Sequence, residues 1–304
     1  MDQIIFNEYI FFILLMIAAA IPVGFFAGLF GIGGGLISVP FLFFIFETFG
    51  IDRNYLMHLT VGTAFTITIL TSFSSVLAHR KHGAVDLSII KTFGTFVVFG
   101  VVTGTIIASM MNTKSLVLFF SIMVYFLGAY LLLAKNKNKK VYPSFNLLPR
   151  LSFGFISGLI SAPMGITGAM INVPVLRYFG YSINRAIGSA AAIGFIISLF
   201  GAIGFFLSGL FKNVDIPLSI GFVNIPAFLI FVPITTIMAR IGANTVHKLE
   251  RSKVQVLFGI FLYVVAKLAV TAIPIKYLVF VSGSICIDFL YALADILKQV
   301  LREQ

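Results

Sequence analysis

Charged residues are scarce in this chain: Asp, Glu, Lys and Arg make up only 10% of its 304 residues. A soluble globular domain carries about 25%, so this chain could not cover its surface with polar groups in water. Tryptophan is absent, and the single cysteine, Cys286, excludes an intrachain disulfide and a cysteine-based metal cluster. Apolar residues are abundant instead, at 60%, with a mean hydropathy of +1.09. The sequence therefore predicts an all-α integral membrane protein with room for roughly ten helices.

Basic residues outnumber acidic ones by 21 to 10. In a soluble protein this excess would suggest a nucleic-acid partner. In a membrane protein, basic loops that face the anionic leaflet explain it, and we expect no nucleic acid to bind. The first apolar run follows Asp2 and Glu8 with no Lys or Arg before it. A cleavable signal peptide begins with basic residues, so we interpret this run as a retained first helix.

An internal repeat divides the chain. Residues 24–40 read G-F-F-A-G-L-F-G-I-G-G-G-L-I-S-V-P, and residues 154–174 read G-F-I-S-G-L-I-S-A-P-M-G-I-T-G-A-M-I-N-V-P, with a four-residue insertion. Further along, Gly62-Thr63-Ala64 corresponds to Gly188-Ser189-Ala190. We therefore divide the chain into a first repeat (1–134), a basic cytoplasmic linker (135–150), a second repeat (151–273) and an extra C-terminal apolar segment (274–304).

Each repeat begins with a glycine-broken hydrophobic pair and continues with three full-length spans. The predicted segments are 9–30, 33–46, 56–78, 87–108 and 115–133 in the first repeat, and 149–161, 166–179, 185–210, 217–241 and 254–272 in the second. The apolar stretch 275–297 has no counterpart in the first repeat, and whether it spans the membrane stays open.

The distribution of basic residues indicates how each broken pair lies in the membrane. If each pair enters and returns on one side, 16 basic residues lie inside and four outside, with Lys267 within a span. If each pair crosses once, ten lie on each side. Cytoplasmic loops are enriched in Lys and Arg, so we predict the returning arrangement. Five segments per repeat then make the two repeats inverted, which is an architecture of transporters.

The two breaks are the candidate binding site. The legs around the second break have 13 and 14 residues, or ~20 Å each at 1.5 Å per residue, which is short of the ~30 Å hydrocarbon core. We therefore expect the turns at 31–35 and 161–165 to meet near the middle of the membrane. A helix that begins after such a turn points free N–H groups and its positive dipole end at a ligand, and glycine lets a small anion approach the backbone.

The predicted substrate-binding residues combine these glycines with neutral hydrogen-bonding side chains. They are Gly31, Gly33, Gly34, Gly35, Ser38, Thr63, Gly165, Thr167, Gly168, Asn172 and Ser189. Close helix packing is the alternative reading of such glycines. It is the one we prefer for the small-xxx-small pairs Gly24/Gly28 and Gly154/Gly158.

These paired motifs resemble a known family. G-I-G-G-G-L-I-S-V-P-F-L at 31–42 and G-I-T-G-A-M-I-N-V-P-V-L at 165–176 are similar to the paired signatures of the TauE/SafE sulfite exporter family, and V-G-T-A and I-G-S-A are similar to its following element. The resemblance covers roughly residues 10–273. It implies a bacterial-type, multi-pass plasma-membrane carrier for small sulfur-containing anions such as sulfite, sulfoacetate or other organosulfonates. Thr167 and Ala169, opposite Gly33 and Gly35, depart from the glycine-rich pattern and leave the particular substrate open.

Ionisable residues within or beside the spans are further candidates. Lys267 could attract an anion or pair with a carboxylate, and Asp288 lies in the unmatched extension. Five further ionisable residues lie near predicted helix ends: Glu47, His58, His79, His82 and Asp86. They could relay protons in a coupled exporter, but the simpler interpretation is that they are solvated residues that cap the helices.

Three functional classes follow, of which a secondary anion transporter, either exporter or permease, is preferred. An enzyme would need an ionisable or nucleophilic constellation inside the membrane, and no predicted span offers one, so we expect no enzymatic activity, cofactor or metal. No G-x-x-x-x-G-K-[ST] motif is present, which excludes a self-contained ATP-driven pump. The alternative is a non-transporting scaffold or accessory subunit. Direction, coupling ion and oligomeric state stay open, a homodimer included.

Overall fold

The structure is a computed structural model and describes residues 2–30, 33–133, 144–246 and 263. Its helices are α1 (Asp2–Phe30), α2 (Gly35–Thr48), α3 (Leu56–Lys81), α4 (Leu87–Met110), α5 (Thr113–Leu133), α6 (Leu147–Met164), α7 (Ala169–Tyr178), α8 (Ile183–Phe211) and α9 (Ile225–Val246). A two-stranded antiparallel hairpin, β1 (Ser219–Ile220) and β2 (Val223–Asn224), connects α8 to α9. Lys267, Cys286, Asp288 and the stretch 275–297 lie outside the described residues.

Seven of the described helices are long and apolar enough to cross a membrane: α1, α3, α4, α5, α6, α8 and α9. Large apolar side chains remain exposed on them, among them Phe99 and Ile106 on α4 and Leu229 and Ile237 on α9. In water such a surface would be unfavourable, whereas lipid tails cover it. The predicted class, an all-α polytopic membrane protein, is therefore confirmed.

Two compact units make up the chain: residues 1–116 with 137–254, and residues 117–136 with 255–304. In the second unit, Tyr125 of α5 packs against Tyr263 with ring centroids 5.9 Å apart. All of the site described below belongs to the first unit.

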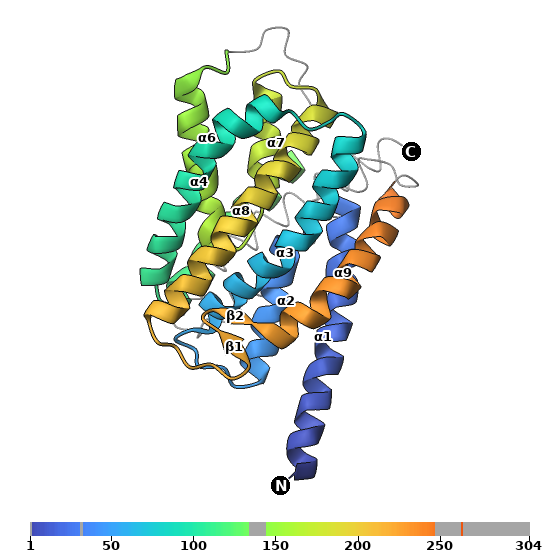
Figure 1. The fold of residues 1–304 in the computed structure, drawn as a ribbon, viewed down its shortest axis with the longest axis vertical. Helices are drawn as coiled ribbons and strands as arrows, with labels where there is room; N and C mark the ends of the chain where they lie inside the picture. Colours follow the sequence, from blue (N-terminus) through green and yellow to red (C-terminus); the bar gives the residue numbers. More distant parts are fainter. Residues whose placement is uncertain (1, 31–32, 134–143, 247–262, 264–304) are drawn as a thin grey trace. The chain divides into compact units, whose positions relative to one another are not determined.

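Both broken pairs return to the side from which they start. Phe49, directly after α2, packs on Phe12 in the first half of α1 with ring centroids 4.8 Å apart. In the second repeat, Phe179 after α7 packs on Phe145, which precedes α6, at 4.4 Å. The two pairs point in opposite directions, with α2 ending at the bottom of Figure 1 and α7 at the top. The glycine-broken hairpins and the inverted repeats are thus both present.

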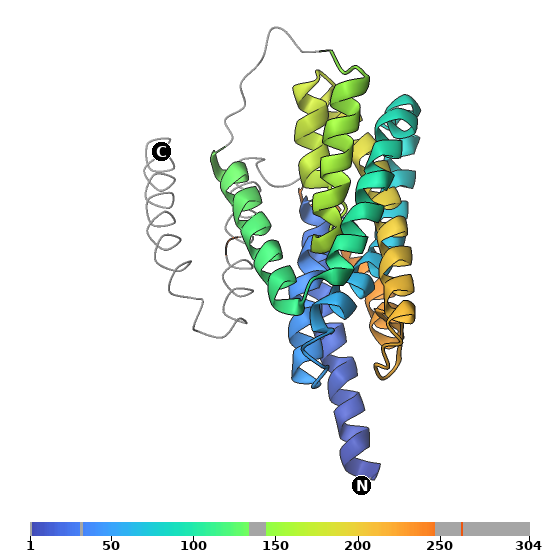
Figure 2. The ribbon, with the colours of Figure 1, turned by 90° about the vertical axis from the view of Figure 1, so that its left-hand side faces the viewer.

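The repeats exchange their fourth helices. The first helix of each repeat packs along the fourth helix of the other: α1 along α9, and α6 along α4 (Figures 1 and 2). The third helices, α3 and α8, pack against each other between these pairs. The two repeats are therefore interlocked within one unit rather than built as separate bodies.

Small residues make these exchanged contacts close. A Cβ on Gly24 would lie 2.6 Å from the Thr235 Cα of α9, and a Cβ on Gly158 would lie 2.7 Å from the Val101 nitrogen of α4. Neither position has room for a larger residue, since backbone atoms cannot give way. The interpretation of the small-xxx-small pairs as packing sites is confirmed.

Candidate functional site

The first break leads into α2 through two glycines with left-handed backbone. Gly33 and Gly34 have φ values of 75° and 84°, and Gly34 is the N-cap of α2. The Gly34 carbonyl accepts the N–H groups of Ile37 and Ser38, at 3.0 and 2.9 Å. The N–H groups of the first helical residues, Gly35 and Leu36, have no intrahelical acceptor and point out of the helix start. Gly31 lies outside the described residues.

The second break also leads into a helix through a left-handed glycine, but it begins several residues later in the chain than the sequence predicted. Helix α6 continues through Ser161–Met164, which the sequence analysis assigned to the turn, and ends at Gly165. The reason is a Schellman cap: with Gly165 at φ 69°, its N–H bonds to the Ala162 carbonyl and the Ile166 N–H to the Ser161 carbonyl, both at 3.3 Å. Gly168 then caps α7 and accepts from Ile171 and Asn172, at 3.0 and 2.8 Å.

The two breaks lie against each other in the middle of the first unit. A Cβ on Gly35 would overlap the carbonyl oxygen of Gly165. A Cβ on Gly33 would lie 2.9 Å from the Thr167 methyl carbon, and one on Gly165 would lie 3.0 Å from a Val39 methyl. The structure therefore brings Gly33, Gly35, Gly165 and Thr167, from the two repeats, to one place.

Two buried polar groups face the start of α7. Asn172 is fully buried, its side-chain oxygen accepts from the Ser157 hydroxyl at 2.6 Å, and its Nδ2 has no hydrogen-bond partner. The hydroxyl of Ser161, also fully buried, has none either. A Cβ on Gly168 would lie 3.1 Å from Asn172 Nδ2 and 2.8 Å from Ser161 Oγ, so both groups border the same point. Buried donors are nearly always satisfied, so a pair left unsatisfied at one point marks a place for an acceptor.

The sequence analysis did not select Ser157 or Ser161 as binding residues. They lie one helical turn apart on α6 and continue the small-residue row of Gly154 and Gly158, which was assigned to packing alone. Their spacing is the signal that could have identified them, because two hydroxyls one turn apart share a helix face.

Helix α3 adds hydroxyl groups around the first break. Thr71 donates to the Gly33 carbonyl at 2.9 Å, and a Cβ on Gly35 would lie 3.2 Å from Thr68 Oγ1. Ser72 lies beside Gly33 in the same way. Ser38, in contrast, donates its hydroxyl to the Gly35 carbonyl within its own helix, at 3.1 Å. The first break is thus lined by α3 hydroxyls, none of which the sequence analysis selected.

Thr63 and Ser189 join the repeats to each other through hydrogen bonds. Thr63 Oγ1 accepts from the backbone N–H of Asn224, which precedes α9, at 3.0 Å. Ser189 Oγ accepts from the N–H of Asp86, the N-cap of α4, at 3.1 Å. Each of these two hydroxyls therefore holds the start of the other repeat's fourth helix.

The break region is uncharged in the part of the chain that the structure describes. Throughout the described residues, the buried polar side chains are Ser, Thr and Asn, together with His58, and none is Lys or Arg. His58 bonds to the Ala108 carbonyl at 3.1 Å and stacks on Phe222. Glu47 pairs with Arg53 at 2.8 Å, and Asp86 caps α4. No group of three His, Cys, Asp or Glu side chains that could hold a metal is found among the described residues.

Comparison with known proteins identifies the family to which the chain belongs. A family model described as "Sulfite exporter TauE/SafE" matches residues 15–267. A "Probable membrane transporter protein" of Haemophilus influenzae is 29% identical over 84% of this chain and 97% of its own length, and one of Methanocaldococcus jannaschii is 25% identical over 83% and 93%. No solved structure matches the chain. A multi-pass membrane chain whose family match spans both repeats and both breaks is a membrane transporter, and it belongs to the sulfite exporter TauE/SafE family.

Proposed function

We propose that this protein is a secondary transporter of small sulfur-containing anions, such as sulfite, sulfoacetate or another organosulfonate, in the plasma membrane of a bacterial-type cell. The observation that carries the proposal is the junction of the two breaks. There the starts of α2 and α7, one from each repeat, lie together with the unsatisfied Asn172 Nδ2 and Ser161 hydroxyl.

The chemistry of this junction suits a small anion. Each helix start contributes free N–H groups and the positive end of a helix dipole, and the amide and hydroxyl contribute neutral donors. A cation would meet the wrong end of both dipoles. A transporter must release its ligand as well as bind it. A site built from backbone and neutral donors releases an anion more easily than a site with a buried lysine or arginine does. No chemical step is involved, so the function is transport without catalysis.

The orientation in the membrane follows from the ends of the helices. One end of the first unit carries most of the described basic residues, among them Arg80, Lys91, Arg150, Arg177, Arg185 and Arg240. The positive-inside rule places this end in the cytoplasm. In the conformation described here Gly35 lies directly on the Gly165 carbonyl, so we take separation of the breaks as part of the movement that admits substrate.

Uptake of radiolabelled sulfite into proteoliposomes tests the proposal. Sulfoacetate, sulfate and acetate are added as competitors, and protein-free liposomes serve as the control. We expect saturable uptake that sulfoacetate competes away more effectively than acetate does. A folded, correctly inserted protein that moves none of these anions would contradict the proposal and favour the scaffold or accessory subunit.

A further inference from the structure

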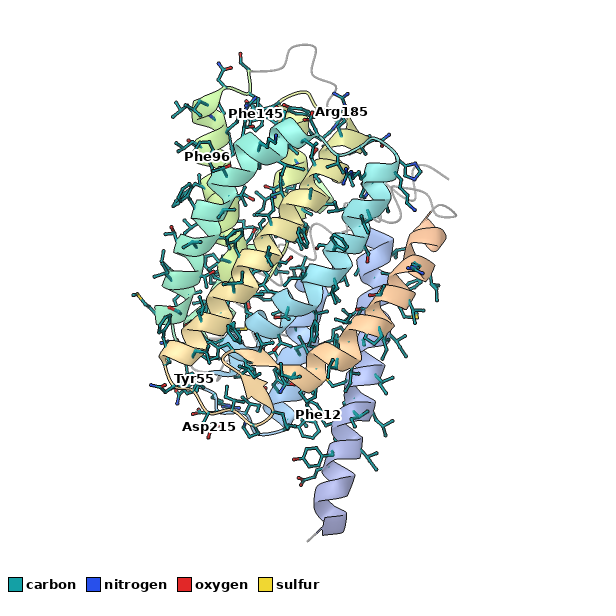
Figure 3. All side chains as sticks on the ribbon, viewed as in Figure 1. Phe12, Tyr55, Phe96, Phe145, Arg185 and Asp215 are labelled. Atoms are coloured by element: carbon teal, nitrogen blue, oxygen red, sulfur yellow. The ribbon has the colours of Figure 1, made fainter. Side chains whose placement is uncertain are left out.

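A cavity of about 630 Å³ opens at the end of the first unit where α6 begins and α7 turns into α8. Its walls include Phe145, Arg150, Phe179, Tyr181, Ser182 and Arg185. Phe145 and Arg185 are labelled together at the top of Figure 3. None of the residues at the junction of the breaks lines it, so the cavity is separate from the proposed transport site.

Two guanidinium groups give the cavity a positive charge. Arg150 lies over the Phe145 ring, with its Cζ 5.1 Å from the ring centroid, and its Nε is buried without a hydrogen-bond partner. Arg185 is exposed, and within the described residues neither arginine forms an ion pair; the ion pair found there joins Arg53 to Glu47. The Asp86 carboxylate forms no ion pair among the described residues; its Oδ1 accepts the N–H groups of Ser88 and Ile89. Both guanidinium groups are therefore available to an anion.

The start of α8 contributes a third positive element. Ser182 is the N-cap of this 29-residue helix and lines the cavity. The free N–H groups and the dipole of the helix start consequently favour negative charge at the same place.

Packed aromatic rings form one wall of the cavity. Phe145 packs on Phe179 and Tyr181, with ring centroids 4.4 and 6.0 Å apart. Arg177 donates to the Tyr181 carbonyl at 3.2 Å and supports the same turn. Arg150 thus packs on an ordered aromatic cluster, so less conformational entropy is lost at this side chain when a ligand binds.

We propose that this cavity is a second anion-binding site, for a phosphate-, sulfate- or sulfonate-type oxyanion that is either free or the head group of an anionic phospholipid. Paired guanidinium groups match the oxygens of such anions through forked hydrogen bonds. The volume lies within the range of about 300–1,000 Å³ found for small-molecule sites, so it can also hold the part of a head group next to the charged atoms.

A single tryptophan can report on this cavity alone, because the sequence contains none. In a Tyr181→Trp variant in phosphatidylcholine nanodiscs, we expect sulfate and phosphate to change the tryptophan emission saturably, while chloride at equal ionic strength does not. In the same background, Arg185→Gln changes an exposed side chain and should leave folding intact, and Arg150→Gln removes the inner guanidinium. Each should raise the sulfate concentration at half-saturation by about 10- to 100-fold, the effect of one lost charge-assisted hydrogen bond.

Arg80→Gln is the matched control, since Arg80 is exposed at the same end but outside the cavity, and it should leave the sulfate concentration at half-saturation unchanged.

Nanodiscs that contain phosphatidylglycerol distinguish the two sources of the anion. If a lipid head group occupies the cavity, phosphatidylglycerol changes the tryptophan emission in the absence of sulfate and raises the sulfate concentration at half-saturation. If a free anion occupies it, the sulfate concentration at half-saturation is the same in both lipids. Absence of a saturable change in both lipids, or equal midpoints in the cavity variants and the Arg80→Gln control, would overturn the proposal. The readout does not depend on sulfite flux, so it stands apart from the transport assay.

Discussion

The hydroxyl oxygen of Thr63 accepts a hydrogen bond from the backbone N–H of Asn224, a residue 161 positions later in the chain. Its counterpart Ser189 accepts from the N–H of Asp86 in the opposite direction. The glycines before the two hydroxyls complete the contact, because a Cβ on Gly62 would overlap the Phe222 carbonyl and one on Gly188 the Ala84 carbonyl. The G-T-A and G-S-A motifs therefore lock the repeats together at opposite ends of the first unit.

Replacing Thr63 by valine tests this lock. The isosteric Thr63→Val change leaves the Asn224 N–H buried without an acceptor, and we expect a loss of about 1–2 kcal/mol in the free energy of unfolding. Thr63→Ser keeps the hydroxyl and should retain most of the stability. Thr66→Val is the matched control, since Thr66 only donates to the Gly62 carbonyl of its own helix, and it should cost less than about 0.5 kcal/mol. Denaturant unfolding in detergent measures all three; equal losses for positions 63 and 66 would contradict the lock.

Asn172 separates a binding role from a structural one. Asn172→Ala removes the unsatisfied Nδ2 donor, and we expect the apparent affinity for the transported anion to fall about 10- to 100-fold. Ser157→Ala breaks the same Ser157–Asn172 hydrogen bond but leaves Nδ2 in place. It should lower thermal stability and change affinity by less than about threefold. If both variants weaken sulfite uptake equally, Asn172 only maintains the fold of the break.

Adding one methyl group at the junction should reduce transport. In Gly35→Ala the new Cβ would overlap the Gly165 carbonyl, so the breaks could no longer close against each other, and we expect a lower unfolding temperature and a lower flux. Gly94→Ala on α4 is the control, because its Cβ would meet only side-chain carbons, at 3.7 and 3.8 Å. There the higher helix propensity of alanine should keep or raise stability by up to about 1 kcal/mol. Normal flux in a folded Gly35→Ala protein would contradict the importance of close contact between the breaks.

Cysteine labelling tests the orientation. In a Cys286→Ser background, Asn184→Cys at the start of α8 and Asp215→Cys after its end place single thiols at opposite ends of the first unit, where Figure 3 labels the neighbouring Arg185 and Asp215. A membrane-impermeant maleimide added to intact cells should label position 215 and spare 184 until the cells are opened. The reverse pattern would mean that the basic end faces outward.

Local patterns in the sequence were sufficient for several features. Low charge and high hydropathy determined that the chain lies in a membrane, and the charge asymmetry predicted that the broken pairs return. Each of these depends on how a segment partitions between water and lipid, which is a property of that segment alone. The alignment of Gly34 with Gly168 likewise identified two helix starts with the same cap, because a left-handed N-cap favours glycine wherever it occurs.

Other features depended on contacts between distant segments, and only the tertiary structure decided them. The sequence alone selected Thr63 and Ser189 as possible substrate hydroxyls, and only the exchange of fourth helices revealed that both accept hydrogen bonds from the other repeat, at Asn224 and Asp86. It also ended α6 too early and did not select Ser157 or Ser161, which the structure places against Asn172 and Gly168 respectively. Hydropathy states that a helix face is apolar or small but not which helix covers it. That choice depends on the fit of surfaces more than a hundred residues apart in the chain, such as Gly35 against the Gly165 carbonyl.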